Sequence, residues 1–200
     1  MPLTRKGAAT KQRIVEGAAG QIREQGVFAV RLEDVMARTA TSKSQLFHYF
    51  PGGKDELLLA VARHEASRVI DEQQPELGSL TSWPAWQQWR DKVVARYRAQ
   101  GSDCPLHAAL AQLGGTTDAT RTVAGELLGR WQRQLAAGIG HMQGSGEIAP
   151  ELDADREAAA LLAGIQGGVL ILMTTGGSTH LEVAIDLGIA HLRASVRSDR

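Results

Sequence analysis

Polar side chains that could read a nucleic acid are concentrated in the segment from Ser42 to Lys54. Gln45 carries an amide whose donor and acceptor can together form a bidentate pair with adenine, and its place early in a short helix suits base readout. The Ser44 hydroxyl can bond to either a base edge or a phosphate. The alternative is that Ser44 and Gln45 only cap the helix on which they lie.

Four further side chains of this segment suit contact with phosphate. Lys43 and Lys54 fall where two helices are expected to begin, and free backbone N–H groups at a helix start already favour phosphate. We expect both lysines to position the protein on a duplex rather than to read its sequence. His48 and Tyr49 are also better suited to phosphate than to base contact.

A short helix would position these side chains. Ser42 can accept a bond from a free backbone N–H, and Gln45, three residues later, completes an S-x-x-Q capping box. Leu46 and Phe50, at i and i+4, form an apolar stripe, and Pro51-Gly52-Gly53 ends the helix. Because a helix of about two turns is not stable alone, neighbouring helices must hold it.

Two predicted helices precede it. The first runs from Thr10 to Gln25, the second from Leu32 to Arg38, and the link Thr39-Ala40-Thr41 leads to the Ser42 helix. The residues expected to face inward are Ile14, Ala18 and Ile22 in the first helix and Leu32, Val35 and Met36 in the second. Three helices with a tight turn between the last two are the helix-turn-helix arrangement, whose last helix enters the major groove of DNA.

The stretch from Thr10 to Leu58 resembles the TetR family of bacterial transcriptional repressors, most closely in the run S-K…L-F-H-Y-F…K-D-E-L that begins at Ser42. The resemblance implies an all-α protein with a helix-turn-helix DNA-binding domain followed by a helical domain for effector binding and dimerisation. The link from Phe50 to Lys54, with two glycines, is similar to the LmrA and YxaF subgroup of repressors. Cys104-Pro105-Leu106 is similar to a run in the same subgroup.

Three positions depart from the family pattern. Val30-Arg31 replaces the usual Thr/Ser pair, so the second helix lacks its hydroxyl cap and Arg31 can instead reach a phosphate. Ala40-Thr41 stands where Gly-Val is common, which predicts an altered turn. Phe47 lacks the hydroxyl of the usual tyrosine and with it a phosphate contact.

Charge is divided unevenly, although the formal net charge of the chain is zero. Residues 1–54 contain nine Lys or Arg against four Asp or Glu, a net charge of +5, which leaves −5 on the remainder. A basic end on an acidic body is typical of a protein that binds phosphate. The alternative is a solvated face whose excess of base is a matter of chance.

Cys104 is the only cysteine, so an internal disulfide and a thiolate zinc site are excluded, and a reducing cytoplasm is the expected location. The polar, basic start of the chain predicts no signal peptide. The stretch from Ala158 to Thr179 contains no charged residue and has the length of a membrane span. Gln166, five glycines and several threonines in it favour a buried helix instead.

Six further helices are predicted after the helix-turn-helix, and the domain boundary is placed so that residues 1–54 bind DNA and residues 55–200 form the body. The predicted helices run from Lys54 to Asp71, Trp83 to Gln100, Pro105 to Leu113 and Asp118 to Met142, from a cap at Asp153 to Thr175, and from Thr179 to Val196. This pattern predicts an all-helical fold.

The last two helices are the predicted subunit interface. Gly164, Gly168 and Gly188 would let helices approach closely, and two such helices from each subunit would form a four-helix bundle, as TetR proteins do. A homodimer would place its two short helices in successive major grooves of a pseudo-palindromic duplex. The proposed seam comprises Leu161, Leu162, Ile165, Gly168, Val169, Leu172 and Met173 on one helix and Leu181, Ala184, Ile185, Gly188, Ile189, Leu192 and Val196 on the other. The alternative is an ordinary core within one chain.

The resemblance also implies an effector pocket between the central helices of the body. Its predicted lining is Trp86, Trp89, Cys104, His107, Trp131, Gln134, Met142 and Gln166, which predicts a small, mostly apolar and aromatic ligand. The alternative is that each tryptophan belongs to the core. A rival mechanism is thiol sensing at Cys104, which has no resolving partner in the same chain.

The sequence does not favour an enzyme. The glycines from Gly138 to Gly144 place the third glycine of a dinucleotide loop one position late, and no strand precedes them. Gly53-Lys54 lacks the earlier glycine of a P-loop, and Asp55 stands where Ser or Thr must bind magnesium. The six histidines include no i,i+3 or i,i+4 pair. We therefore expect no catalytic residue, cofactor or metal; the competing class is a cytoplasmic helical ligand-binding protein or enzyme that ignores DNA.

Overall fold

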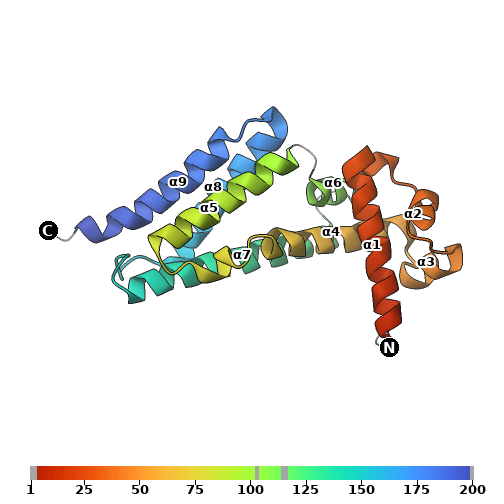
Figure 1. Ribbon diagram of the computed structural model, residues 1–200, viewed down its shortest axis with the longest axis horizontal. Helices are drawn as coiled ribbons and strands as arrows, with labels where there is room; N and C mark the ends of the chain where they lie inside the picture. The colour runs from red at the N-terminus through yellow and green to blue at the C-terminus, as the bar shows by residue number, and fades with distance from the viewer. Residues whose placement is uncertain (1–3, 102–103, 114–116, 199–200) are drawn as a thin grey trace. The chain divides into compact units, whose positions relative to one another are not determined.

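The computed structural model describes residues 4–101, 104–113 and 117–198, and over these residues the chain is helical without strands (Figure 1), which confirms the all-α prediction. The elements are α1 (Arg5–Gln25), η1 (Val27–Ala29), α2 (Leu32–Arg38), α3 (Lys43–Tyr49), α4 (Gly53–Asp71), η2 (Glu76–Ser79), α5 (Trp83–Gln100), α6 (Pro105–Gln112), α7 (Asp118–Gly144), α8 (Ala154–Thr175), α9 (Thr179–Ala194) and η3 (Ser195–Ser198).

The chain forms two compact units. The first is Met1–Arg68 with Asp103–Gly125, and the second is Val69–Ser102 with Glu126–Arg200. Helix α6 belongs to the first unit because it packs against α1 and η1. The units therefore divide the chain elsewhere than the predicted boundary between residues 54 and 55.

In the first unit, α1 begins five residues before its predicted start. The Thr4 side chain accepts a hydrogen bond from the Gly7 N–H at 3.1 Å and so caps the helix at Arg5. The helix ends at Gly26, whose φ of 80° is unfavourable for other residues. The predicted inward residues Ile14, Ala18 and Ile22 are buried, as is Val35 of α2, whereas Leu32 and Met36 are half-buried.

A buried acid joins α1 to α4 within the same unit. Arg23 donates to Glu65 at 2.8 Å, and Arg68 donates to the same carboxylate at 3.2 Å. Gln12 of α1 also hydrogen-bonds to the His64 ring at 3.2 Å. These contacts fix α4, which follows α3 directly, against the helix on which α2 packs.

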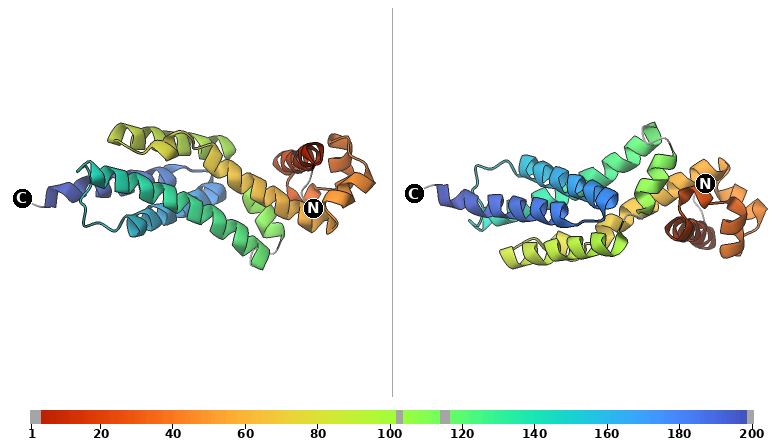
Figure 2. Two further views of the ribbon diagram at one scale, coloured as in Figure 1. Left: turned by 90° about the horizontal axis from the view of Figure 1, so that it is seen from below. Right: turned by 90° about the horizontal axis from the view of Figure 1, so that it is seen from above.

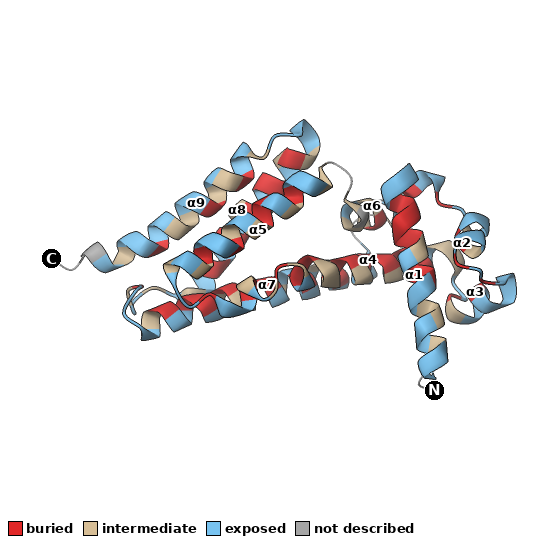
Figure 3. Ribbon diagram, in the orientation of Figure 1, coloured by how far each residue is buried: buried red, intermediate tan, exposed pale blue. Residues whose placement is uncertain are grey.

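The second unit has a tryptophan-rich core. Trp86 and Trp89 on α5 and Trp131 on α7 are fully buried. Figure 3 shows buried segments, in red, along both helices. The Trp89 indole N–H donates to Gln73 at 2.9 Å, and Gln73 in turn donates to the Val69 carbonyl. Burying two polar groups costs little here because each satisfies the other.

Helices α8 and α9 lie side by side (Figure 2), and glycines allow their close approach. A Cβ on Gly168 would lie 2.4 Å from the Leu181 Cα, and one on Gly188 would lie 2.6 Å from the Leu161 Cδ1. Of the described helices, α8 is long and apolar enough to cross a membrane by length and composition. Its packing along α9 is that of a helix in a bundle.

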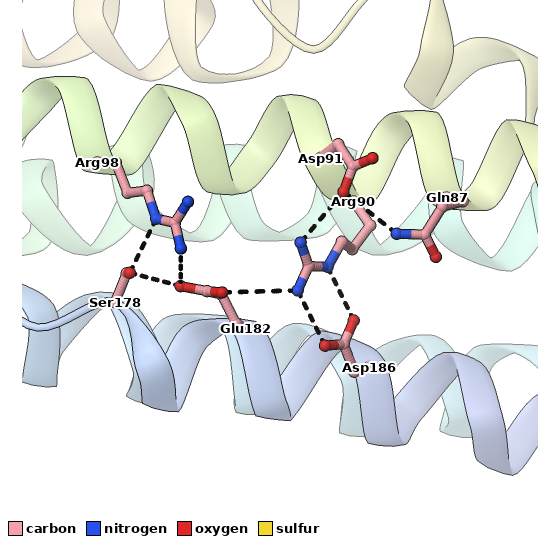
Figure 4. Close-up of polar contacts among 7 residues, drawn as sticks. All are labelled: Gln87, Arg90, Asp91, Arg98, Ser178, Glu182 and Asp186. Carbon is pink, nitrogen blue, oxygen red and sulfur yellow. Dashed lines mark hydrogen bonds and ion pairs between the residues drawn. The ribbon is translucent and has the colours of Figure 1, made fainter.

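Ion pairs join α5 to α9 (Figure 4). Arg90 donates to both carboxylate oxygens of Asp186, at 2.8 and 2.9 Å, and Arg98 donates to Glu182 at 2.6 Å and to the Ser178 hydroxyl at 3.0 Å. The Ser178 hydroxyl and the Arg98 guanidinium lower the pKa of Glu182. Bidentate arginine–carboxylate geometry fixes the direction of both partners, so these pairs orient α9 on α5.

Candidate functional site

Helix α3 is held by both hydrogen bonds of the predicted capping box. The Ser42 side chain accepts from the Gln45 N–H at 3.2 Å, and the Gln45 Oε1 accepts from the Ser42 N–H at 3.1 Å. Leu46 and Phe50 are completely buried. The short helix is therefore fixed at its start by the cap and along one side by apolar packing.

The opposite side of α3 is exposed and polar. Lys43, Ser44, Gln45 and His48 are exposed, and Tyr49 is half-buried with its ring edge-on to His48 at a centroid distance of 4.9 Å. Five of the seven predicted DNA contacts thus lie on one helix of seven residues. This arrangement presents hydrogen-bonding groups to a groove while the buried side holds the helix in place.

The turn before α3 contains a strained residue that the sequence pattern had marked. Ala40 has a φ of 47°, in the left-handed region that favours glycine. The hydroxyl of buried Thr39 donates to the Val35 carbonyl at 2.7 Å and lies within hydrogen-bond distance, 2.9 Å, of the Thr41 hydroxyl. Arg13 of α1 donates to the Thr39 carbonyl at 3.0 Å. Alanine at position 40 thus adopts a conformation that glycine favours, and threonine hydroxyl groups hold the turn.

Arg13 and the threonines position α3, and sequence reasoning did not identify them. The sequence signal that could have identified the threonines is their position on either side of Ala40, where the turn requires positive φ although the residue is not glycine. A Cβ on Gly17 would lie 2.3 Å from the Thr39 Cγ2, so Gly17 lets the turn approach α1. The positioning of α3 therefore depends on α1 as well as on α2.

Basic residues at two other helix starts remain available for an anion. Arg31 is the N-cap residue of α2 and makes no side-chain cap bond, as predicted. Lys54 is the second residue of α4. Among the described residues, neither these two side chains nor Lys43 forms an ion pair, whereas Arg38 is held by Glu24 through two bonds of 2.7 Å. The Arg38 guanidinium lowers the pKa of Glu24.

The predicted effector residues are divided between the two units. Cys104, half-buried, and His107, exposed, belong to the first unit. The other six belong to the second, where Trp86, Trp89, Trp131 and Met142 are completely buried and Gln134 and Gln166 are half-buried. The four buried residues take part in a packed core, as the alternative interpretation held.

Two of the buried indoles nevertheless lack a hydrogen-bond acceptor. The N–H groups of Trp86 and Trp131 are buried and have no partner in the described part of the chain, unlike that of Trp89. A groove of about 240 Å³ lies between η2 and α7 in the same unit. Its lining is Leu77, Gly78, Leu80, Thr81, Gln134, Ala137, Gly138 and His141, so Gln134 is the predicted residue that faces it. Trp131 precedes Gln134 by one helical turn and lies on the same side of α7.

The predicted seam residues of α8 and α9 lie largely inside the chain. Leu172 and Ile185 are 1% and 0% exposed, because the two helices of one chain bury them against each other and against the rest of the unit. The large apolar side chains that remain exposed on these helices are Leu170 (57%), Val183 (48%) and Leu187 (65%). An open groove of about 460 Å³ is lined by Leu187 and by Leu161, Ala184, Gly188 and Leu192 of the predicted seam. The exposed side chains thus include residues that the sequence pattern did not select, and part of the predicted seam borders the same groove.

Family models match both parts of the chain. The family described as "Bacterial regulatory proteins, tetR family" matches residues 14–61, which include α2 and α3. "Tetracyclin repressor-like, C-terminal domain" matches residues 85–187, just over half of the chain.

Proteins of similar sequence or fold are transcriptional regulators. An uncharacterized HTH-type transcriptional regulator of Mycobacterium tuberculosis is 28% identical over 175 residues, covering 78% of this chain and 84% of the relative. Transcriptional regulator AcuR of Cereibacter sphaeroides is 22% identical over 163 residues, covering 80% and 74%. The crystal structure of a TetR transcription regulator from Haloarcula marismortui has a TM-score of 0.76 at 17% identity, covering 94% of this chain and 98% of that one. This last likeness establishes the fold.

Proposed function

The chain belongs to the TetR family of bacterial transcriptional regulators, and from that premise we propose that it is a repressor that a small effector releases from its operator. The observation that carries the proposal is the exposed polar face of α3, which the capping box and the buried Leu46 hold in place. We assign DNA binding to residues 1–54 and effector binding with dimerisation to residues 55–200. Within the family we place the protein beside the LmrA and YxaF repressors, and in the cytoplasm.

DNA recognition would divide between base and phosphate contacts. Ser44 and Gln45 would meet base edges, because they are exposed in the first turn of α3. Phosphate contacts would come from side chains at helix starts and from the rest of the exposed face of α3, namely Arg31, Lys43, His48, Tyr49 and Lys54.

A homodimer would place two copies of α3 on a pseudo-palindromic operator. Its support is the exposed apolar side chains of Leu170, Val183 and Leu187 and the open groove that Leu187 lines, since exposed apolar surface on a folded subunit marks an interaction site. A second copy of α8 and α9 would complete a four-helix bundle.

The effector site is proposed in the second unit. Its support is the unpartnered indole N–H groups of Trp86 and Trp131 and the groove beside Gln134. A small, mostly apolar, aromatic molecule would match the lining, with few polar groups fixing its orientation. For release, it must bind the form of the dimer that cannot engage DNA more tightly than the form that can.

An electrophoretic shift assay on the DNA upstream of the protein's own gene tests this function at several salt concentrations. Affinity should fall steeply with salt, and Lys54→Ala should reduce the slope of log K against log salt by about one for each phosphate that the protein no longer neutralises. Arg130→Ala, which removes an exposed charge from the second unit, is the matched control and should leave the slope unchanged. Absence of salt-dependent binding would refute the proposal.

A further inference from the structure

The basic segment of α1, from Arg5 to Arg13, extends beyond the packed part of the helix. Ile14 is the first buried residue of α1, and every residue of the basic segment is exposed or half-buried (Figure 3). The segment contains four Lys or Arg and no Asp or Glu. Packing within the unit therefore does not account for it, and its positive charge is open to an anionic partner.

Most other Lys and Arg residues of positions 1–54 already have a partner or a proposed contact. Those with a partner inside the protein are Arg13, Arg23 and Arg38, and those with a proposed phosphate contact are Arg31, Lys43 and Lys54. The three that remain are Arg5, Lys6 and Lys11, all in the basic segment. In the described part of the chain, the Arg5 and Lys6 side chains form no hydrogen bond or ion pair, and the Lys11 ammonium meets only an aromatic ring.

Contacts at both ends of α3 place the basic segment beside the helix-turn-helix. Arg13 donates to the Thr39 carbonyl at 3.0 Å, in the turn before α3. The Lys11 Nζ lies 5.4 Å from the centre of the ring of Phe50, which ends α3. Lys6 precedes Arg13 by seven residues, so it lies on the same side of α1, about 10 Å further along the helix axis.

Helical spacing separates Lys6 and Lys11 from Arg5. Lys6 and Lys11 are each within about a quarter turn of Ile14 around the α1 axis, and Ile14 is completely buried. Arg5 precedes Ile14 by about two and a half turns, so it points away from the unit. Two of the three free cations thus lie on the sides of α1 that border the helix-turn-helix.

The dimensions of DNA match this arrangement. Helix α3 would occupy a major groove about 12 Å wide, with a row of phosphates along each edge. Lys11 lies beside the end of α3, and Lys6 lies about 10 Å along α1 from the turn that precedes it, so both are within reach of those edges. A Lys ammonium binds phosphate as a point charge and carries no sequence information.

Resting on the proposed DNA-binding function, we propose that the basic segment of α1 is a second DNA-contact surface, in which Lys6 and Lys11 bind phosphates beside the groove that α3 occupies. These contacts raise affinity and fix the register of α3 on the duplex, whereas base choice stays with α3. Arg5 takes no part in the surface.

The test measures the salt dependence of binding to one duplex selected from random DNA by the wild type. Lys6→Ala should lower the slope of log K against log salt by about one for each phosphate lost, or about two for a dimer. Lys11→Met keeps the stem over Phe50 without the charge and should act likewise. Lys6→Arg should keep the wild-type slope, because it restores the charge.

Arg5→Ala is the matched control, since it removes the same charge from the same turn of α1 but from the opposite side, and it should keep the wild-type slope. The urea midpoint of Lys6→Ala should equal that of the wild type, because Lys6 is exposed and alanine favours a helix. Selection from random DNA should return the same preferred sequence for both proteins.

Unchanged slopes in Lys6→Ala and Lys11→Met would overturn the proposal. An equal fall in Arg5→Ala would also overturn it, because net charge and not a surface of α1 would then be responsible, and so would a changed base preference in Lys6→Ala. In each of these cases the protein still binds DNA and the proposed function stands. Absence of salt-dependent binding by the wild type would instead refute that function.

Discussion

The outer face of α3 and the outward face of α8 and α9 are both exposed, but they expose opposite chemistry. On α3, the exposed residues include Lys43, Ser44 and Gln45. On α8 and α9, they include Leu170 and Leu187. Polar groups are satisfied by water until DNA replaces it, whereas exposed apolar side chains gain stability only when another surface covers them. The difference is what the proposed dimer requires, because only the α8–α9 face would gain stability from a second copy of the chain.

The two regions are also held in different ways. A strained turn and a few hydrogen bonds position α3, since Ala40 has positive φ and Thr39 and Arg13 support it. Helices α8 and α9 instead depend on close approach at Gly168 and Gly188. Substitutions should therefore act through hydrogen-bond geometry in one region and through packing in the other.

The largest effect should come from a charge on the apolar face. Leu187→Glu would bury two like-charged, unpaired carboxylates in a symmetric interface, so we expect the dimer dissociation constant to rise by about a thousandfold or more. Sedimentation analysis should show a folded monomer, because Leu187 is 65% exposed in one chain. Ser44→Glu, on the polar face of α3, is the matched control and should leave the dimer intact. If Leu187→Glu forms a dimer with an unchanged dissociation constant, the exposed apolar side chains of α8 and α9 do not form the subunit interface.

The next effect concerns the packing of α8 on α9. Gly168→Ala would place a Cβ against the Leu181 backbone, and we expect it to destabilise the protein by about 1–3 kcal/mol in urea unfolding. Gly167→Ala is the control, because nothing lies within 4 Å of its Cβ, and it should be neutral or stabilising by up to about 1 kcal/mol. Equal effects of the two substitutions would show that close approach does not hold these helices.

A smaller change in the free energy of unfolding, in this case a stabilisation, is expected from a substitution in the turn before α3. Ala40→Gly removes a left-handed penalty of roughly 1–2 kcal/mol but adds chain entropy of roughly 0.5–1 kcal/mol to the unfolded state, so the free energy of unfolding should rise by up to about 1.5 kcal/mol. Ala37→Gly, in the helical part of α2, should instead destabilise by about 1 kcal/mol. Destabilisation by Ala40→Gly would mean that the turn is not strained.

The smallest effect should be the acid sensitivity of the α5–α9 contact. The pKa of Glu182 is lowered below its ordinary value of about 4.5 by the Ser178 hydroxyl and by Arg98, so its contribution is present above that value and is lost as pH falls through the lowered pKa. The urea midpoint, measured from neutral pH downwards, should therefore fall less steeply in acid for Glu182→Gln. Glu151→Gln, at an exposed residue outside this contact, should keep the wild-type profile.

The sequence by itself determined the features that neighbouring residues decide. The capping box of Ser42 and Gln45, the buried stripe of Leu46 and Phe50 and the Asp153 cap of α8 were all predicted and are present. Each depends on backbone groups within a few residues, so local chemistry is sufficient. The start of α1 was missed because Thr4 caps a first turn that carries little apolar periodicity.

Only the tertiary structure decided which surfaces face outward and which polar groups find partners. Helices α8 and α9 are apolar on more than one side, so periodicity could not distinguish Leu172 and Ile185, which are buried within the chain, from Leu170 and Leu187, which are exposed. The same holds for the indoles: Trp89 donates to Gln73, whereas Trp86 has no acceptor among the residues that the structure describes, although both lie on the same face of α5. Burial and pairing depend on residues that are distant in the chain, and close packing, which no local pattern records, brings them together.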